Sequence, residues 1–177
     1  MAVLQSTTLV VVGDDGALLR SLAGHVNVRA ASLSGRDDDE VAAWVRGAAT
    51  PYLVHDSDPL QHVAAAWVEF FDDRSTLGAL ELEIERAVEA LERGAVAVPD
   101  YYVVVDPAGM PATWRHWWLG VMAQASPTRI LPRSEGDPSL TRVLRRLPTG
   151  RPWPEPGRWL RSVVTAVPDR VGLGSAA

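Results

Sequence analysis

Residues 7–16 read TTLVVVGDDG, and this stretch decides the fold class. A continuous run of β-branched and aliphatic residues is typical of a strand that is buried on both faces, and the glycines and acids that follow predict a turn. PYLVHD at 51–56 and DYYVVV at 100–105 repeat the pattern. Shorter strands are predicted at 26–33 and 128–131. Strands buried on both faces belong to parallel sheets, so we expect an α/β protein.

Helical patterns separate these strands. Apolar residues recur at helical spacing over 75–93, with glutamates on another face and Gly94 as the expected end of the helix. Further helices are predicted at 17–23, 37–48, 58–71, from 111, from 137 and at 158–167. Their alternation with strands predicts a three-layer, Rossmann-like or flavodoxin-like sandwich, with a mainly parallel sheet of about five strands and helices on both faces.

The domain organisation follows from the same pattern. No linker is long enough to split the chain, so we expect one α/β domain over 1–177. Residues 1–134 form its sheet-bearing core, and 135–177 form a helical extension rich in Arg, Pro and Trp. No stretch is apolar enough for a membrane helix, and the N-terminus lacks a secretion signal, so a cytoplasmic protein with no membrane contact is expected.

Two residue types are missing from the sequence. There is no cysteine, which excludes disulfides, thiolate metal sites and thiol nucleophiles. There is also no lysine, because all 17 basic residues are arginine. Schiff-base chemistry and a phosphate-binding loop lysine are therefore excluded. The glycines at 13–16 do not match a dinucleotide-binding motif either.

Carboxylates follow three of the predicted strands. In a parallel sheet Asp14, Asp15, Asp56 and Asp106 lie at the carboxyl edge, where ligands of open α/β sheets bind. Such a cluster predicts an Mg²⁺ site, and His55 and Arg133 are the candidate residues for phosphate or substrate. Aspartate is also a common turn and N-cap residue, which is the structural alternative, particularly for Asp14 and Asp58. Apart from this Mg²⁺, no cofactor is predicted.

The acidic pair after the first strand and the Asp that ends the third resemble the phosphoacceptor pocket of response-regulator receiver domains, over roughly the first 60 residues. That resemblance implies a phosphoacceptor aspartate. The family's phosphate-binding lysine is missing, and Arg133 is the nearest substitute. Asp56-Ser57-Asp58 resembles the D-x-D of TOPRIM-type metal sites, but Asp14 stands where that pattern has a glutamate.

The last third of the chain carries a different signal. Residues 101–177 hold 10 Arg against 5 acids, a net +5, whereas residues 1–100 hold 7 Arg against 17 acids, a net −10. Arginine combined with tryptophan is typical of protein interfaces. The predicted partner-binding residues are Arg142, Arg145, Arg146, Trp153 and Trp159. The alternative is that the proline-rich loop flanked by Trp153 and Trp159 folds back on the acidic helix that carries Glu81–Glu92.

These observations leave the function unknown, but they rank the possible classes of function. The first is a non-catalytic binding or assembly module whose C-terminal part contacts a protein partner or a second copy, for example as a homodimer. Nucleic acid is disfavoured by the net charge of −5 and the missing lysine. The alternative is an Mg²⁺-dependent phosphoryl-handling enzyme or a receiver-like phosphoacceptor. Whether the protein is an enzyme stays open, and no catalytic residue is assigned.

Overall fold

The computed structural model describes residues 6–13, 16–134, 140–147 and 152–165. These residues form two compact units. Unit 1 draws on 1–58, 99–107 and 131–149, and unit 2 on 59–98, 108–130 and 150–177. The single domain over 1–177 stays a prediction. The expected C-terminal extension contributes one helix to each unit, α7 (Leu140–Leu144) to unit 1 and α8 (Pro156–Ser162) to unit 2.

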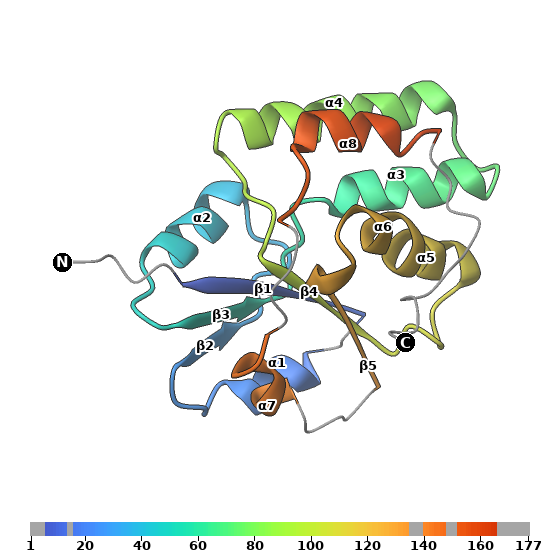
Figure 1. Ribbon diagram of the computed structural model, residues 1–177. Helices are drawn as coiled ribbons and strands as arrows, with labels where there is room; N and C mark the ends of the chain where they lie inside the picture. Colours follow the sequence, from blue (N-terminus) through green and yellow to red (C-terminus); the bar gives the residue numbers. More distant parts are fainter. Residues whose placement is uncertain (1–5, 14–15, 135–139, 148–151, 166–177) are drawn as a thin grey trace. The chain divides into compact units, whose positions relative to one another are not determined.

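The sheet has five parallel strands, as the α/β assignment predicts (Figure 1). Its order is β2-β3-β1-β4-β5. The strands are β1 (Thr7–Val12), β2 (Val28–Ala31), β3 (Tyr52–His55), β4 (Tyr101–Val105) and β5 (Ile130–Arg133). β1 pairs with β3 on one side and β4 on the other, with Val10 opposite both His55 and Tyr102. Residues that follow β3, β1 and β4 therefore share one stretch of the carboxyl edge.

One face of the sheet packs against α1 (Ala17–Leu22) and α7. The apolar cluster on this face joins Leu19 and Leu22 of α1 and Leu144 of α7 to alternate residues of the strands. The strand members buried in it are Leu9, Val11, Val54, Tyr101, Val103, Val105 and Leu131. Their spacing of two is the strand period, which turns every second side chain to the same face.

The opposite face carries α2 (Asp38–Arg46). Val54 belongs to the α1 side, so the neighbouring Leu53 and His55 point the other way. There the His55 ring meets the Trp44 ring of α2 edge-on, with their centroids 5.8 Å apart. Unit 1 is therefore a three-layer arrangement, with helices on both faces of a parallel sheet, as predicted.

Unit 2 is helical. Its elements are α3 (Gln61–Phe71), α4 (Leu77–Glu92), α5 (Ala112–His116), a π-helix (Trp117–Met122), α6 (Ala123–Ala125), a short 3₁₀ turn (Pro127–Arg129) and α8. α4 matches its prediction closely. Thr76 caps its start by accepting a hydrogen bond from the Ala79 amide, and Gly94 follows its end with φ 68°. Leu80, Ile84 and Val88, four residues apart, form its buried stripe.

Tryptophan side chains fill the centre of unit 2. Trp67 of α3 is 1% exposed, and its ring lies 4.4 Å from the Phe71 ring and 5.7 Å from the Trp117 ring, measured between centroids. Its indole Nε1 donates a hydrogen bond to the Val163 carbonyl just after α8, at 3.1 Å. Trp67 and Trp117 are therefore packing residues of unit 2. Within the described residues, no helix is long and apolar enough to cross a membrane.

Candidate functional site

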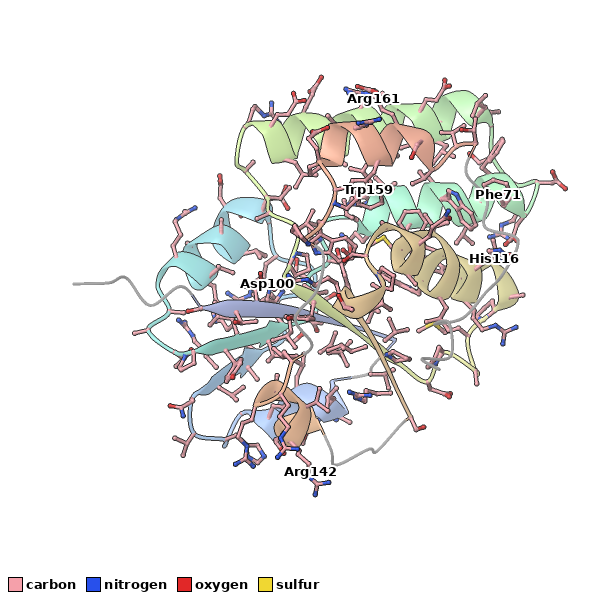
Figure 2. The ribbon with its side chains drawn as sticks, viewed as in Figure 1. Phe71, Asp100, His116, Arg142, Trp159 and Arg161 are labelled. Atoms are coloured by element: carbon pink, nitrogen blue, oxygen red, sulfur yellow. The ribbon has the colours of Figure 1, made fainter. Side chains whose placement is uncertain are left out.

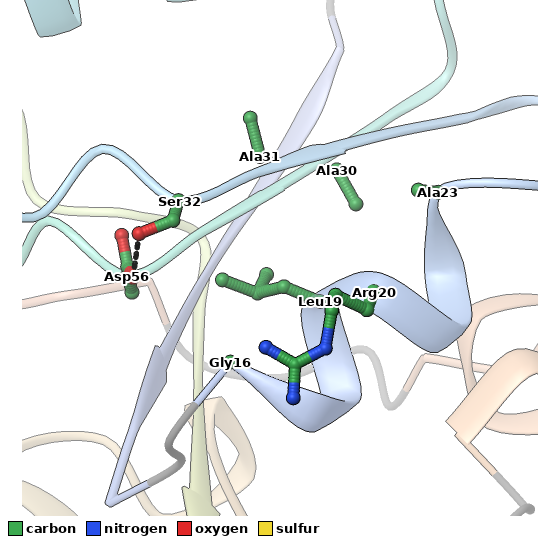
Figure 3. Close-up of a pocket in the computed structure, with 8 residues that line it drawn as sticks. All are labelled: Gly16, Leu19, Arg20, Ala23, Ala30, Ala31, Ser32 and Asp56. Atoms are coloured by element: carbon green, nitrogen blue, oxygen red, sulfur yellow. Dashed lines mark hydrogen bonds between the residues drawn. The ribbon is translucent and has the colours of Figure 1, made fainter.

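A pocket opens at the carboxyl side of unit 1, between α1 and β2 (Figure 3). Its volume is about 430 Å³, within the usual range of small-molecule sites. Eight residues line it: Gly16, Leu19, Arg20, Ala23, Ala30, Ala31, Ser32 and Asp56. The pocket lies where open α/β sheets bind ligands, outside the carboxyl ends of the strands.

Asp56 directly follows β3 and holds the loop that follows β2. Its Oδ1 accepts hydrogen bonds from the amides of Leu33 and Ser34, at 2.6 and 2.8 Å, and its Oδ2 accepts one from the Ser32 hydroxyl at 2.6 Å. A carboxylate has about four acceptor positions, two on each oxygen. One acceptor position therefore stays open on Oδ2, the oxygen that accepts the hydrogen bond from Ser32.

Arg20 supplies the positive charge of the pocket. Its side chain is exposed, and within the described part of the chain no acceptor or acid pairs with its guanidinium. The guanidinium folds back over the first turn of α1, because Nη1 lies 3.1 Å from the point where a side chain at Gly16 would begin. Gly16 has φ +92°, a conformation that glycine adopts without strain.

His55 is buried under α2 instead of lining the pocket. It is 4% exposed, and burial, which disfavours the charged ring, lowers its pKa from 6.5 to about 4, although the charge of Asp56 acts in the opposite direction. The imidazole is therefore neutral at physiological pH.

The other predicted edge residues lie apart from this pocket. Asp106 is exposed after β4 with φ 44°, and its amide donates to the Arg133 carbonyl of β5 at 2.7 Å. The Arg133 Nη1 donates to the adjacent Pro132 carbonyl. Asp14 and Asp15 lie outside the described residues. Across the described ranges, no three acidic or histidine side chains are grouped as a metal site requires. The Mg²⁺ site stays a prediction.

Asp58 has a structural role that differs from the expected helix cap. α3 begins at Gln61, and Leu60 occupies its N-cap position. Asp58 is instead buried, at 6% exposure, and its Oδ1 accepts a hydrogen bond from the Tyr102 hydroxyl at 2.8 Å. Burial and the neighbouring Asp58 charge raise the pKa of Tyr102 well above 10, so the phenol stays a donor.

The five predicted partner-binding residues divide between the units. Arg142, Arg145 and Arg146 are exposed on and after α7 of unit 1. Trp153 and Trp159 belong to unit 2, where their rings stack at 6.2 Å between centroids; Trp153 is half-buried and Trp159 is only 7% exposed.

Within unit 2 the alternative prediction is confirmed, because α8 folds onto the acidic helix α4. Arg161, labelled with Trp159 in Figure 2, donates two hydrogen bonds to the Glu85 carboxylate, at 2.7 and 2.8 Å. The guanidinium of Arg161 lowers the pKa of Glu85.

Among the residues of the pocket, only Asp56 was predicted from the sequence, and the other two polar side chains, Arg20 and Ser32, were missed. Arg20 stands in a short helical pattern as an ordinary exposed residue, and Ser32 lies within the strand predicted at 26–33, although the observed β2 ends at Ala31. Neither residue carries a local sequence signal, because only the packing of α1 on the sheet brings Arg20 beside the loop that holds Ser32. Comparison with protein-family models, curated proteins and solved structures finds no match to this chain.

Proposed function

We propose that unit 1 is a non-catalytic binding module and that its carboxyl-edge pocket holds a small phosphorylated metabolite. The observation that carries the proposal is the guanidinium of Arg20, which lines the pocket without a partner among the described residues. A guanidinium presents five N–H donors in a planar fork that matches a phosphate group. The pocket volume of about 430 Å³ suits a molecule of metabolite size.

The hydrogen bonds of Asp56 favour binding over the Mg²⁺-dependent alternative. Its two oxygens already hold the 32–34 loop through three hydrogen bonds. A receiver-like phosphoacceptor or a metal ligand at Asp56 would have to use the one acceptor position left on Oδ2 or give up some of these contacts. The alternative depends on Asp14 and Asp15, and it predicts that millimolar Mg²⁺ raises the melting temperature of the wild type more than that of Asp56→Asn.

Arg20→Gln tests the binding function. The wild type is expected to melt at a higher temperature with millimolar adenosine 5′-monophosphate or ribose 5-phosphate, because a ligand that binds the folded state alone stabilises it. Replacing the charged donor is expected to weaken Kd about 10- to 100-fold, since a hydrogen bond to a charged group contributes about 1.5–3 kcal/mol. Thermal melting followed by calorimetric titration measures both effects.

Arg46→Gln is the matched control for this test. Arg46 is exposed in the last turn of α2, which covers the opposite face of the sheet from α1. This variant is expected to bind as the wild type does. Equal loss in the two variants would mean that general positive charge, and not the pocket, attracts phosphate. The absence of any shift with either phosphate would remove the proposal.

A second candidate function is protein binding. The part of the predicted interface that supports it consists of Arg142, Arg145 and Arg146. All three are exposed on the α7 segment, and none of their guanidinium groups has a partner within the described residues. The charge-reversing pair Arg142→Glu and Arg145→Glu is expected to abolish self-association if the partner is a second copy, which light scattering at varied salt concentration measures. A monomeric wild type would exclude the homodimer form of this proposal.

A further inference from the structure

We propose that the ligand of the pocket is a ribonucleoside monophosphate, recognised through the cis-diol of its ribose by Ser32 and Asp56. This inference rests on the proposed binding function and specifies the class of ligand. It follows from the hydrogen-bonding capacity left on these two side chains and from where the apolar part of the pocket lies.

Ser32 and Asp56 present acceptors without donors to the pocket. The Ser32 hydroxyl gives its proton to Asp56 Oδ2 at 2.6 Å, so its oxygen keeps only acceptor positions. Oδ2 keeps one acceptor position as well, because Oδ1 takes both backbone amides. A ligand group that binds here must therefore donate hydrogen bonds. A phosphate cannot lie at this end of the pocket, because its oxygens would face the Asp56 carboxylate with no hydrogen-bond donor between the two anions.

The spacing of the two acceptors favours a pair of neighbouring hydroxyls. Ser32 Oγ and Asp56 Oδ2 are 2.6 Å apart, close to the separation of the two oxygens in a cis-diol. Each hydroxyl can then donate to one of the two oxygens.

The donor and apolar parts of the pocket complete the match to a nucleotide. The Arg20 guanidinium, over Gly16, is the one cationic group that lines the pocket among the residues described, and it is the place for the phosphate. Ala30 of β2 precedes Ser32, which directly follows the strand, by two residues, a spacing that places the two side chains on the same side about 6–7 Å apart. Figure 3 shows Ala23 and Ala30 at the end of the pocket away from Ser32 and Asp56. This small, apolar wall can hold the flat face of a base.

Titration calorimetry with three ligands tests the assignment on the full chain. Adenosine 5′-monophosphate is expected to bind about 10- to 100-fold more tightly than its 2′,3′-dideoxy form, because two hydrogen bonds are lost, one of them to a carboxylate. It is also expected to bind more tightly than ribose 5-phosphate, which lacks the base. Equal affinity for adenosine 5′-monophosphate and its dideoxy form would overturn the diol assignment. Equal affinity for adenosine 5′-monophosphate and ribose 5-phosphate would overturn the assignment of the apolar wall to the base.

Two variants tie the diol preference to these side chains. Asp56→Asn can still accept the Leu33 and Ser34 amides through its carbonyl oxygen while it turns the Oδ2 position into a donor, and Ser32→Ala removes the second acceptor. Each is expected to lower the ratio of the two affinities, because it removes one of the two hydrogen bonds to the diol, while leaving the contact of Arg20 with the phosphate. A ratio that is unchanged in the folded variant Ser32→Ala would overturn the proposal even if Asp56→Asn failed to fold.

The outcomes separate this inference from the proposed function. If adenosine 5′-monophosphate and its 2′,3′-dideoxy form bind equally and Arg20→Gln weakens the binding of both, the phosphate-binding function stands and the diol assignment is wrong. If none of the three ligands binds, the proposed function fails together with the assignment.

Discussion

Replacement of Trp67 by alanine is expected to lower the free energy of unfolding by about 3–5 kcal/mol, the largest effect of any substitution considered for this chain. The side chain is 1% exposed and contacts the rings of Phe71 and Trp117. Truncation leaves a cavity that close-packed neighbours can fill only in part. Urea denaturation followed by far-ultraviolet circular dichroism measures the change.

The variant Trp67→Phe separates packing from hydrogen bonding. Phenylalanine keeps most of the ring contacts, but it removes the N–H that donates to the Val163 carbonyl at 3.1 Å. The expected loss is about 1–3 kcal/mol, because a buried carbonyl is left without its donor. If Trp67→Ala unfolds at the urea concentration of the wild type, Trp67 is not part of the packed core of unit 2.

The second large effect is a loss of stability in mild acid that depends on His55. In the folded protein the pKa of His55 is about 4, whereas an exposed histidine has a pKa of 6.5. Between these values the unfolded chain binds a proton that the folded chain does not, so stability falls as the pH decreases from 6.5 to 4. The full difference amounts to about 3 kcal/mol, and this contribution levels off below pH 4.

Melting temperatures between pH 7 and pH 4 test this dependence. His55→Gln removes the titrating group and is expected to flatten the curve in this window, whatever its stability at pH 7. His62→Gln is the control, because His62 is exposed at the start of α3. It is expected to retain the pH dependence of the wild type. Parallel curves for the wild type and His55→Gln would show that His55 does not cause the acid sensitivity.

The candidate site was predicted less completely than the fold. Asp56 was expected at the carboxyl edge because it ends a buried strand, and it lies there. Its main contacts are nevertheless with the amides of Leu33 and Ser34, which are 23 and 22 residues away in the sequence. Arg20 carries no local signal that would distinguish it from any exposed arginine on a helix. Its position against Gly16 and β2 depends on how α1 packs on the sheet.

Features with a local cause were predicted from the sequence alone. The β-branched run at 7–12, and its repeats before His55 and Asp106, determined a parallel sheet, because such residues bury both faces of a strand. Asp37 was expected to begin a helix, and its carboxylate accepts the Glu40 amide at 2.8 Å. The stripe of α4 follows from its period of 3.6 residues in the same way.

Other features were decided only by the tertiary structure. The order β2-β3-β1-β4-β5, the pairing of Asp58 with Tyr102 and the contact of Arg161 with Glu85 join residues that are distant in the sequence. Periodicity and capping depend on neighbours within a few residues, so a sequence records them directly. Which strand lies beside which, and which charge meets which, depends on how whole faces pack together, and no short stretch of residues records that.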